Sequence, residues 1–337
     1  QETGATVRFL PDGGGWVTPA RVSATLVEEL DGSFTAKRGH FEVFSFDSDG
    51  VLQSESDLFG NETDYVYDVG GELDYLEDEA GRRLEVTWSS GRLSSVSAPG
   101  RDALTPQVVS FAYDVAGDLT SYTDAGGGVW SFTYDLDHRM LTMRKPANQG
   151  GAPGAVIENH YDLAGRVDWQ DDELDARTTF EYDTPTADRT TTTDPMGREK
   201  IVTYTDGLAT AITTAAGTPS EATWFQEFDR ATLGLVRVID PNGNATTHRY
   251  DLAGNRVYTA DPGGVRFSAE YGPLDLPVWT QDGTGVRTAM SWDADDGRLL
   301  SVTENSLDGS PANRRVTGYG YTDVSHPEDL TEVSALV

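Results

Sequence analysis

The chain has 337 residues, with 25 Lys or Arg against 56 Asp or Glu, so its formal net charge at pH 7 is −31. This balance excludes general nucleic-acid binding and attachment to anionic membranes, because both depend on clustered basic residues. The absence of Cys excludes disulfide bonds, thiolate zinc sites, iron–sulfur clusters and a Cys nucleophile. No apolar run approaches the ~18 residues of a spanning segment, so membrane insertion is not expected.

Three regions follow one another along the chain. Residues 1–40 are predicted to be a strand-rich lead-in or cap. Residues 41–325 carry a repeat and are predicted to form an array of β-hairpins. Residues 326–337 are predicted to be a C-terminal tail that continues into further sequence.

An aromatic residue, usually followed by Asp, recurs about every 21 residues within the array. The spacing is 21 from Phe46 to Tyr67 and again from Tyr161 to Tyr182. Longer intervals coincide with Gly- and Pro-rich insertions such as residues 149–154, which predict lengthened loops. We call these aromatic residues anchors: Phe46, Tyr67, Trp88, Tyr113, Tyr134, Tyr161, Tyr182, Tyr204, Phe228, Tyr250, Tyr271, Trp292 and, after a longer interval, Tyr321.

Two tight turns are predicted in each repeat. The first follows the anchor, with Asp directly after it and Gly four residues after it, at Gly50, Gly71, Gly117, Gly165 and Gly254. The second begins at another Asp eleven or twelve residues after the anchor, for example at Asp194, Asp240 and Asp261, each followed by Pro. Asp accepts backbone N–H bonds, Pro fixes φ, and Gly tolerates positive φ. Both sequences therefore predict type I turns, often with a G1 bulge.

The segments between the turns are about six residues long and alternate as half-buried strands do, as at Phe132 and Tyr134. We therefore predict an all-β protein in which hairpins of about 21 residues form one continuous, spiralling antiparallel sheet, with the anchors as its packing layer. The alternative is a β-propeller, because two repeats have the length of one blade. Tyr161→Ala is expected to cost about 3–5 kcal/mol and Gly165→Val to be comparably harmful, whereas Arg166→Ala should be mild.

Several segments resemble the YD repeat of RHS-repeat proteins. They are Tyr161-Asp-Leu-Ala-Gly-Arg-Val167, Tyr250-Asp-Leu-Ala-Gly-Asn-Arg-Val257, Tyr113-Asp-Val-Ala-Gly-Asp-Leu119 and Asp261-Pro-Gly-Gly264, and the resemblance extends over residues 30–325. The family includes RHS polymorphic toxins, the BC components of toxin complexes and teneurins. The resemblance implies a β-sheet that winds into a hollow shell, which in bacteria sequesters a C-terminal toxin and in teneurins serves adhesion. The Asp-Pro-x-Gly-Leu block linked to self-cleavage in bacterial members is absent after Trp292.

No catalytic or cofactor-binding residue is predicted. None of the five His residues has metal-ligand spacing, and no nucleophile elbow or phosphate-binding loop is present; the His residues are His40, His138, His160, His248 and His326. Asp293, Asp295 and Glu304 are the candidates for calcium, although Gly falls at position 5 of that loop rather than at position 6. A similar start at Asp47 has Leu58 where the loop needs Glu. We therefore expect no dedicated cofactor, only incidental Ca²⁺ or Mg²⁺ at turn carboxylates.

Three functions are compared. The first is a noncatalytic structural module of a secreted or cell-surface RHS shell, whose partner is a protein cargo such as a toxin or another segment of the same polypeptide. The second is an extracellular adhesin or glycan-binding module that binds a cell-surface glycan or protein. The third is a polysaccharide-acting enzyme. The sequence disfavours the enzyme, because no position breaks the repeat with a polar constellation, so our prediction is the first function.

Overall fold

The computed structural model describes residues 7–18, 22, 24–39, 42–57, 59–100, 105–147, 154–230, 233–308, 313–324, 326 and 329–336. These residues form β-strands and turns and contain no α-helix. The chain divides into two compact units, Gln1–Asp64 with Gln226–Val337, and Tyr65–Phe225, each of which is described by itself. His40 and Leu58, considered above, lie outside the described residues.

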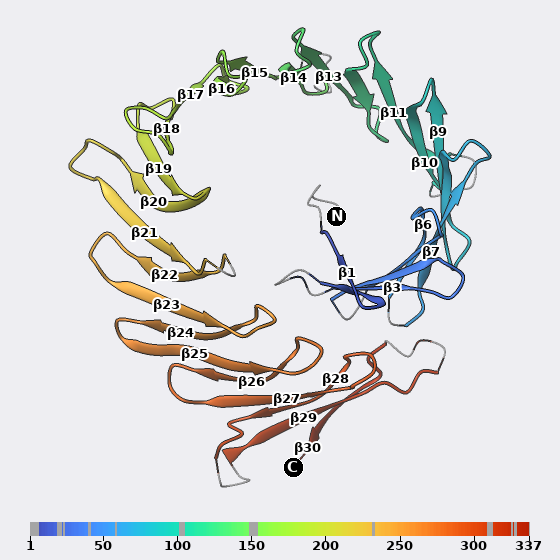
Figure 1. The fold of residues 1–337 in the computed structure, drawn as a ribbon, viewed down its shortest axis with the longest axis vertical. Helices are drawn as coiled ribbons and strands as arrows, with labels where there is room; N and C mark the ends of the chain where they lie inside the picture. The colour runs from blue at the N-terminus through green and yellow to red at the C-terminus, as the bar shows by residue number, and fades with distance from the viewer. Residues whose placement is uncertain are drawn as a thin grey trace. The chain divides into compact units, whose positions relative to one another are not determined.

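The Tyr65–Phe225 unit is an uninterrupted antiparallel meander (Figure 1). From β8 to β21, every strand pairs with the next along the chain. The strands are β7 (Glu62–Tyr67), β8 (Leu73–Asp78), β9 (Arg83–Ser89), β10 (Arg92–Ala98), β11 (Gln107–Tyr113), β12 (Leu119–Thr123), β13 (Val129–Tyr134), β14 (Met140–Arg144), β15 (Val156–Tyr161), β16 (Val167–Asp171), β17 (Arg177–Tyr182), β18 (Arg189–Thr193), β19 (Glu199–Thr205), β20 (Leu208–Thr214) and β21 (Ala222–Phe228), the first and last of which extend past the limits of the unit.

The other unit contains the same hairpin pattern in two stretches of sequence. The first has β1 (Leu10–Asp12), β2 (Gly15–Val17), β3 (Ala24–Glu28), β4 (Phe34–Arg38), β5 (Glu42–Phe46) and β6 (Leu52–Asp57). The second has β22 (Leu235–Ile239), β23 (Ala245–Tyr250), β24 (Arg256–Asp261), β25 (Gly264–Tyr271), β26 (Pro277–Asp282), β27 (Arg287–Trp292), β28 (Leu299–Glu304), β29 (Arg315–Gly320) and β30 (Glu332–Leu336). Strand β30, within the region predicted as a tail, pairs antiparallel with β29.

The prediction of an all-β array of antiparallel hairpins is confirmed. The propeller alternative is wrong, because propeller blades are separate sheets of four strands. Here β8–β21 continue from strand to strand without such a break. Each hairpin supplies an edge on which the next can pair, so sequence neighbours are also neighbours in the sheet.

The two faces of this sheet differ in chemistry. Phe111 pairs with Tyr122 and Tyr122 with Trp130, so the three rings share one face. Tyr122 stacks on Trp130 with ring centroids 5.7 Å apart and lies 6.2 Å from Phe132. We call this side the anchor face, because Phe132 and the anchor Tyr134 alternate along the same side of β13. The opposite side is the polar face, with Ser121, Ser131, Thr133, Thr142 and Glu158 in register.

Burial is shallow throughout the described residues. Their most buried apolar side chains are Phe132 and Ala269, which are 9% and 6% exposed. Most anchors are half-buried, and Trp88 is 37% exposed. The sheet is therefore stabilised by many partly buried cross-strand contacts rather than by a closed core. No helix in the described part of the chain is long and apolar enough to cross a membrane.

Candidate functional site: the anchor turn

The turn that directly follows an anchor, which we call the anchor turn, is the most regular repeated element of the chain. In the turn after Tyr161, the Gly165 N–H donates to the Asp162 carbonyl at 3.0 Å and the Asp162 N–H donates to the Arg166 carbonyl at 2.8 Å. The Asp162 carboxylate accepts the N–H groups of Ala164 and Arg166 at 2.8 and 2.9 Å. These bonds lower the pKa of Asp162, that from the Arg166 backbone most strongly. Asp is thus required here as an acceptor for two backbone donors that the turn leaves unpaired.

The fourth residue after the anchor has a left-handed backbone. Gly165 has a φ of 79°. His138 occupies the equivalent position after Tyr134 with a φ of 63°, and its Nδ1 lies 2.8 Å from a carboxylate oxygen of Asp118 in the preceding anchor turn. This contact raises the pKa of His138. The predicted glycines Gly50, Gly71, Gly117, Gly165 and Gly254 all have positive φ.

A β-bulge accompanies the anchor. Thr133 pairs with Thr142 but Tyr134 pairs with Met140, so Leu141 is an extra residue on the second strand. The anchor itself ends its strand. The same placement at a strand end holds for Phe46, Tyr67, Tyr113, Tyr134, Tyr161, Tyr182, Phe228, Tyr250, Tyr271 and Trp292. A bulge of this kind, which increases the local twist of a hairpin, also lies beside Phe46, Tyr113, Tyr161, Tyr250, Tyr271 and Trp292. Tyr182 pairs with Thr190 without one.

Anchor side chains link successive repeats by hydrogen bonds. The Tyr161 hydroxyl donates at 2.7 Å to the carbonyl of Met140, the residue that pairs with the preceding anchor Tyr134. Other anchors make the equivalent bond: Trp88 to Leu73, Tyr182 to Val167, Tyr250 to Leu235, Trp292 to Pro277 and Tyr321 to Leu299. The sequence pattern predicts the anchors only as packing groups, so this link is an addition from the structure. Its signal was available, because most anchors are Tyr or Trp, whose rings carry a donor.

Turn arginines make a second link. Arg139 bonds the Asp135 carboxylate of its own turn at 2.7 Å, and its guanidinium lies 4.9 Å from the ring centre of Tyr161, the next anchor. Arg166 repeats the arrangement at 4.4 Å from Tyr182. Its side chain also bonds Asp162 at 3.0 Å and Asp183 at 2.8 Å. Each such Arg therefore joins the turn of one repeat to the aromatic ring of the next.

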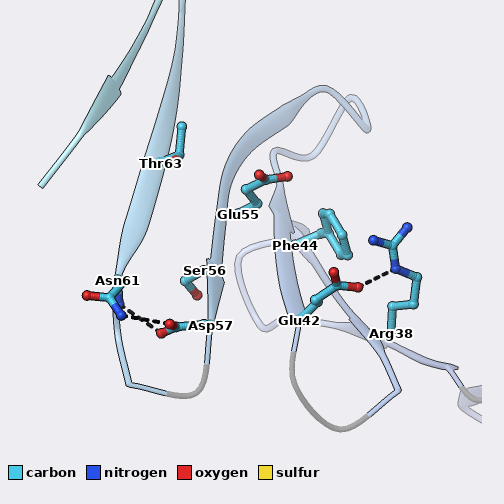
Figure 2. Close-up of a pocket in the computed structure, with 8 residues that line it drawn as sticks. All are labelled: Arg38, Glu42, Phe44, Glu55, Ser56, Asp57, Asn61 and Thr63. Carbon is cyan, nitrogen blue, oxygen red and sulfur yellow. Dashed lines mark hydrogen bonds and ion pairs between the residues drawn. The ribbon is translucent and has the colours of Figure 1, made fainter. Parts of the chain in front are cut away.

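A polar pocket of about 320 Å³ lies over β4–β7 in the unit that contains the N-terminal stretch (Figure 2). Arg38 forms an ion pair with Glu42, and the Arg38 guanidinium lies 5.2 Å from the centre of the Phe44 ring. Asn61 donates to Asp57 at 2.7 Å. Burial acts to raise the pKa of Asp57, but the bonds from Asn61 and the turn amides outweigh it and the pKa is lowered. The remaining lining residues are Glu55, Ser56 and Thr63, so carboxylates and hydroxyls make up much of the lining.

The calcium candidates are not brought together. Asp293 begins the turn after β27 and accepts the Asp295 N–H at 3.0 Å. Glu304 ends β28 and pairs with Arg315, a strand length of about 17 Å away from that turn. No group of three metal-ligating side chains occurs within the ranges that the structure describes.

Three further His residues each contact a neighbouring side chain. His160 stacks on Trp169 with ring centroids 5.1 Å apart, and its Nδ1 lies 2.6 Å from Asp168. His248 lies 3.0 Å from the Thr259 hydroxyl, and burial lowers its pKa. His326 lies 3.5 Å from Asp323. Each of these three His residues thus has a local partner.

The chain matches one family model, and it is similar in fold to solved structures of toxin complexes. The RHS Repeat family model matches residues 113–149 and 228–266. The crystal structure of TcdB2-TccC3-Cdc42 has a TM-score of 0.50 and 13% identity, covering 94% of this chain and 21% of that chain. TcdB2-TccC3 without its hypervariable C-terminal region has a TM-score of 0.45 and 14% identity, covering 97% and 22%. A Tc holotoxin pore of Photorhabdus luminescens has a TM-score of 0.43 and 14% identity, covering 93% and 21%. The chain thus spans about a fifth of the length of the solved structures it matches.

Proposed function

We propose, from the premise that this chain is an RHS-repeat protein, that it is a noncatalytic structural segment of a larger RHS shell that encloses or presents a protein cargo. The observation that carries the proposal is the anchor face of the single-layer sheet. Its rings, such as Tyr122 and Trp130, are only half-buried by their neighbours in the sheet. A single-layer sheet with one aromatic, half-buried face suits the wall of a compartment better than a self-contained globule.

The cargo that fits is a polypeptide, either another segment of the same protein or a separate toxin. Aromatic rings over many strands offer sequence-tolerant apolar contacts, whereas the described part of the chain assembles no metal group. The net charge of −31 favours a secreted or cell-surface location, where a hydrated acidic surface keeps a protein soluble.

The aromatic rings on the polar face of the sheet give little support to a glycan-binding function. A glycan-binding ring must offer an open surface on which a sugar can stack. Arg83 lies 4.0 Å from the ring centre of Tyr75, and Arg177 lies 3.6 Å from that of Trp169. Arg287 covers Trp279 in the same way at 3.9 Å. A ring surface of each is therefore already occupied.

The test is protease protection in the complete protein that contains these repeats. We expect a non-repeat segment to resist a nonspecific protease while the sheet is folded and to be digested once urea melts the sheet. The control is the same segment produced without the repeats, which should be digested rapidly. Digestion at one rate with and without the folded sheet would contradict enclosure.

A further inference from the structure

One repeat carries a charge at a position that is apolar in the others. The residue that pairs with an anchor beside the bulge has an apolar side chain in six repeats, at Leu52, Leu119, Met140, Val167, Pro277 and Leu299. In the repeat of Tyr250 that residue is Arg256. The Tyr250 repeat therefore breaks the pattern with a guanidinium group.

Arg256 lies on the anchor face of β23–β25. Its guanidinium is 5.7 Å from the centre of the Phe267 ring. Phe267 pairs with Thr259, and Thr259 pairs with His248. His248 precedes the anchor Tyr250 by two residues in one strand, so both side chains stand on the same side of the sheet. The ring beneath the guanidinium is therefore part of the aromatic layer.

The charge of Arg256 is not compensated by the turns beside it. Asp251 and Asp275, the carboxylates of the two neighbouring anchor turns, each accept a hydrogen bond from the Asn255 amide, at 3.1 and 2.9 Å. Within the ranges that the structure describes, no carboxylate forms an ion pair with Arg256. Arg166, in contrast, bonds two turn carboxylates. The exposed guanidinium of Arg256 thus retains N–H donors for a group outside the sheet.

His248 adds no second positive charge at neutral pH. Burial, and then the charge of Arg256, lowers its pKa, and its Nδ1 lies 3.0 Å from the Thr259 hydroxyl. The site therefore combines one cationic fork, one uncharged imidazole and one aromatic ring. A guanidinium fork matches the two oxygens of a carboxylate, while the ring can contact the apolar atoms that carry it.

Covering the anchor face would remove Arg256 from water. A guanidinium buried against apolar groups without a partner destabilises the contact, whereas a carboxylate opposite it restores the balance. The net charge of −31 opposes anions at long range, but charges more than about 8 Å away are largely screened at physiological salt. The local charge of Arg256 therefore decides which group is accepted at this position.

We propose that Arg256 is a binding site for the carboxylate of an Asp or Glu side chain in the polypeptide that covers the anchor face. This inference rests on the proposed enclosure of a polypeptide and adds a chemical preference to it. The site selects one acidic side chain within a segment that otherwise makes apolar contacts with the rings.

NMR titration of the full chain with three short peptides tests the proposal. The peptides have blocked ends and differ only in a central Glu, Gln or Lys flanked by Leu. We expect the Glu peptide to bind at least about threefold more tightly than the Gln peptide, and the Lys peptide to bind most weakly. Binding of the Glu peptide should raise the pKa of His248, because the carboxylate offsets the charge of Arg256.

Variants separate this site from a general effect of charge. Arg256→Leu introduces a side chain that other repeats carry at this position, so it should remain folded by circular dichroism and lose the preference for Glu over Gln. Arg249→Gln is the matched control. Arg249 lies 4.8 Å from the Tyr258 ring centre on the polar face, and its loss should leave the preference unchanged.

Four results would overturn the proposal. They are equal affinity for the Glu and Gln peptides, a preference that survives Arg256→Leu, a preference that Arg249→Gln also abolishes, and displacement of the Glu peptide by an equal concentration of inorganic phosphate, which would indicate a general oxyanion site. These titrations use the free chain, so they can fail while protease protection in the complete protein persists. Failure of the site and failure of enclosure are thereby distinguished.

Discussion

At the residue scale, the donor group on the anchor ring, the hydroxyl of Tyr or the indole N–H of Trp, explains why a packing position so often holds Tyr or Trp rather than Phe. The ring contributes to the anchor face, and its polar tip satisfies a backbone carbonyl beside the bulge of the preceding repeat, as Tyr161 does for Met140. A bulge disrupts the ladder locally and leaves backbone groups to be paired elsewhere. The bulge and the anchor are therefore coupled features of neighbouring repeats.

Tyr161→Phe is expected to lower the free energy of unfolding by about 0.5–1.5 kcal/mol, because it removes this hydrogen bond and keeps the ring. Urea denaturation measures the change. Tyr134→Phe is the matched control, since within the described residues no hydrogen bond is recorded for the Tyr134 hydroxyl. Equal losses in both variants would mean that the bond to Met140 contributes nothing of its own.

Arg166→Ala is expected to be more harmful than the sequence pattern predicts. The pKa of Arg166 is raised by Asp183 and then by Asp162, and its guanidinium stacks on Tyr182. Arg198→Ala is the comparison, because Arg198 pairs with Asp194 of its own turn at 2.6 Å. The urea midpoint should fall further for Arg166→Ala than for Arg198→Ala. A smaller shift for Arg166→Ala would show that the link between repeats is not stabilising.

At the element scale, two kinds of turn are common after the anchors. Most anchors that are followed by Asp have a type I turn with a left-handed fourth residue, as at Gly165. After β9 and β19, where no Asp follows the anchor, the turn shortens to two residues with positive φ, Ser90–Gly91 and Asp206–Gly207. Positive φ at both central residues is the type I′ pattern, which suits the twist of a hairpin.

Gly207→Ala is expected to cost about 1–2 kcal/mol, because Gly207 has a φ of 78° and an L side chain is strained there. Asp206→Asn at the neighbouring position should be neutral or slightly stabilising, since Asn is favoured in this turn. Thermal unfolding of the two variants checks the pair. An unfolding temperature that Gly207→Ala leaves unchanged would contradict the type I′ assignment.

The hairpin array could be predicted from the sequence because its determinants are local. Asp162 and Gly165 lie within one turn, and strand alternation is read over six residues. The bond from Tyr161 to Met140 could not be predicted in the same way. It joins residues 21 positions apart and depends on a bulge that the Asp–Gly spacing does not reveal. The full exposure of Leu163 was also missed, since this residue was interpreted only as part of a motif.

At the scale of the whole molecule, electrostatics act in two opposing ways. Turn carboxylates are held in their charged form by neighbours: Arg139 lowers the pKa of Asp135, and the Arg198 backbone N–H lowers that of Asp194. Meanwhile an excess of 31 negative charges repels itself across the molecule. The local bonds are short and weakly screened, whereas the general repulsion acts over longer distances and is screened by salt.

Stability should therefore rise with salt at neutral pH and fall in acid. A carboxyl group whose pKa is lowered on folding contributes stability above its unfolded value of about 3.9, and this is lost as pH falls through the folded value. His138 acts in the opposite sense. Its pKa is raised by Asp118, so its contribution is present below about 6.5 and lost as pH rises through the folded value.

Urea midpoints measured at pH 2.5, 5 and 7, each in 0.02 and in 0.5 M NaCl, test this balance. The midpoint should be highest near pH 5, where the carboxylates are still charged and His138 is protonated. At pH 7 it should increase with salt. A midpoint that falls with salt at pH 7 would mean that the turn ion pairs outweigh the repulsion among the 56 acidic side chains.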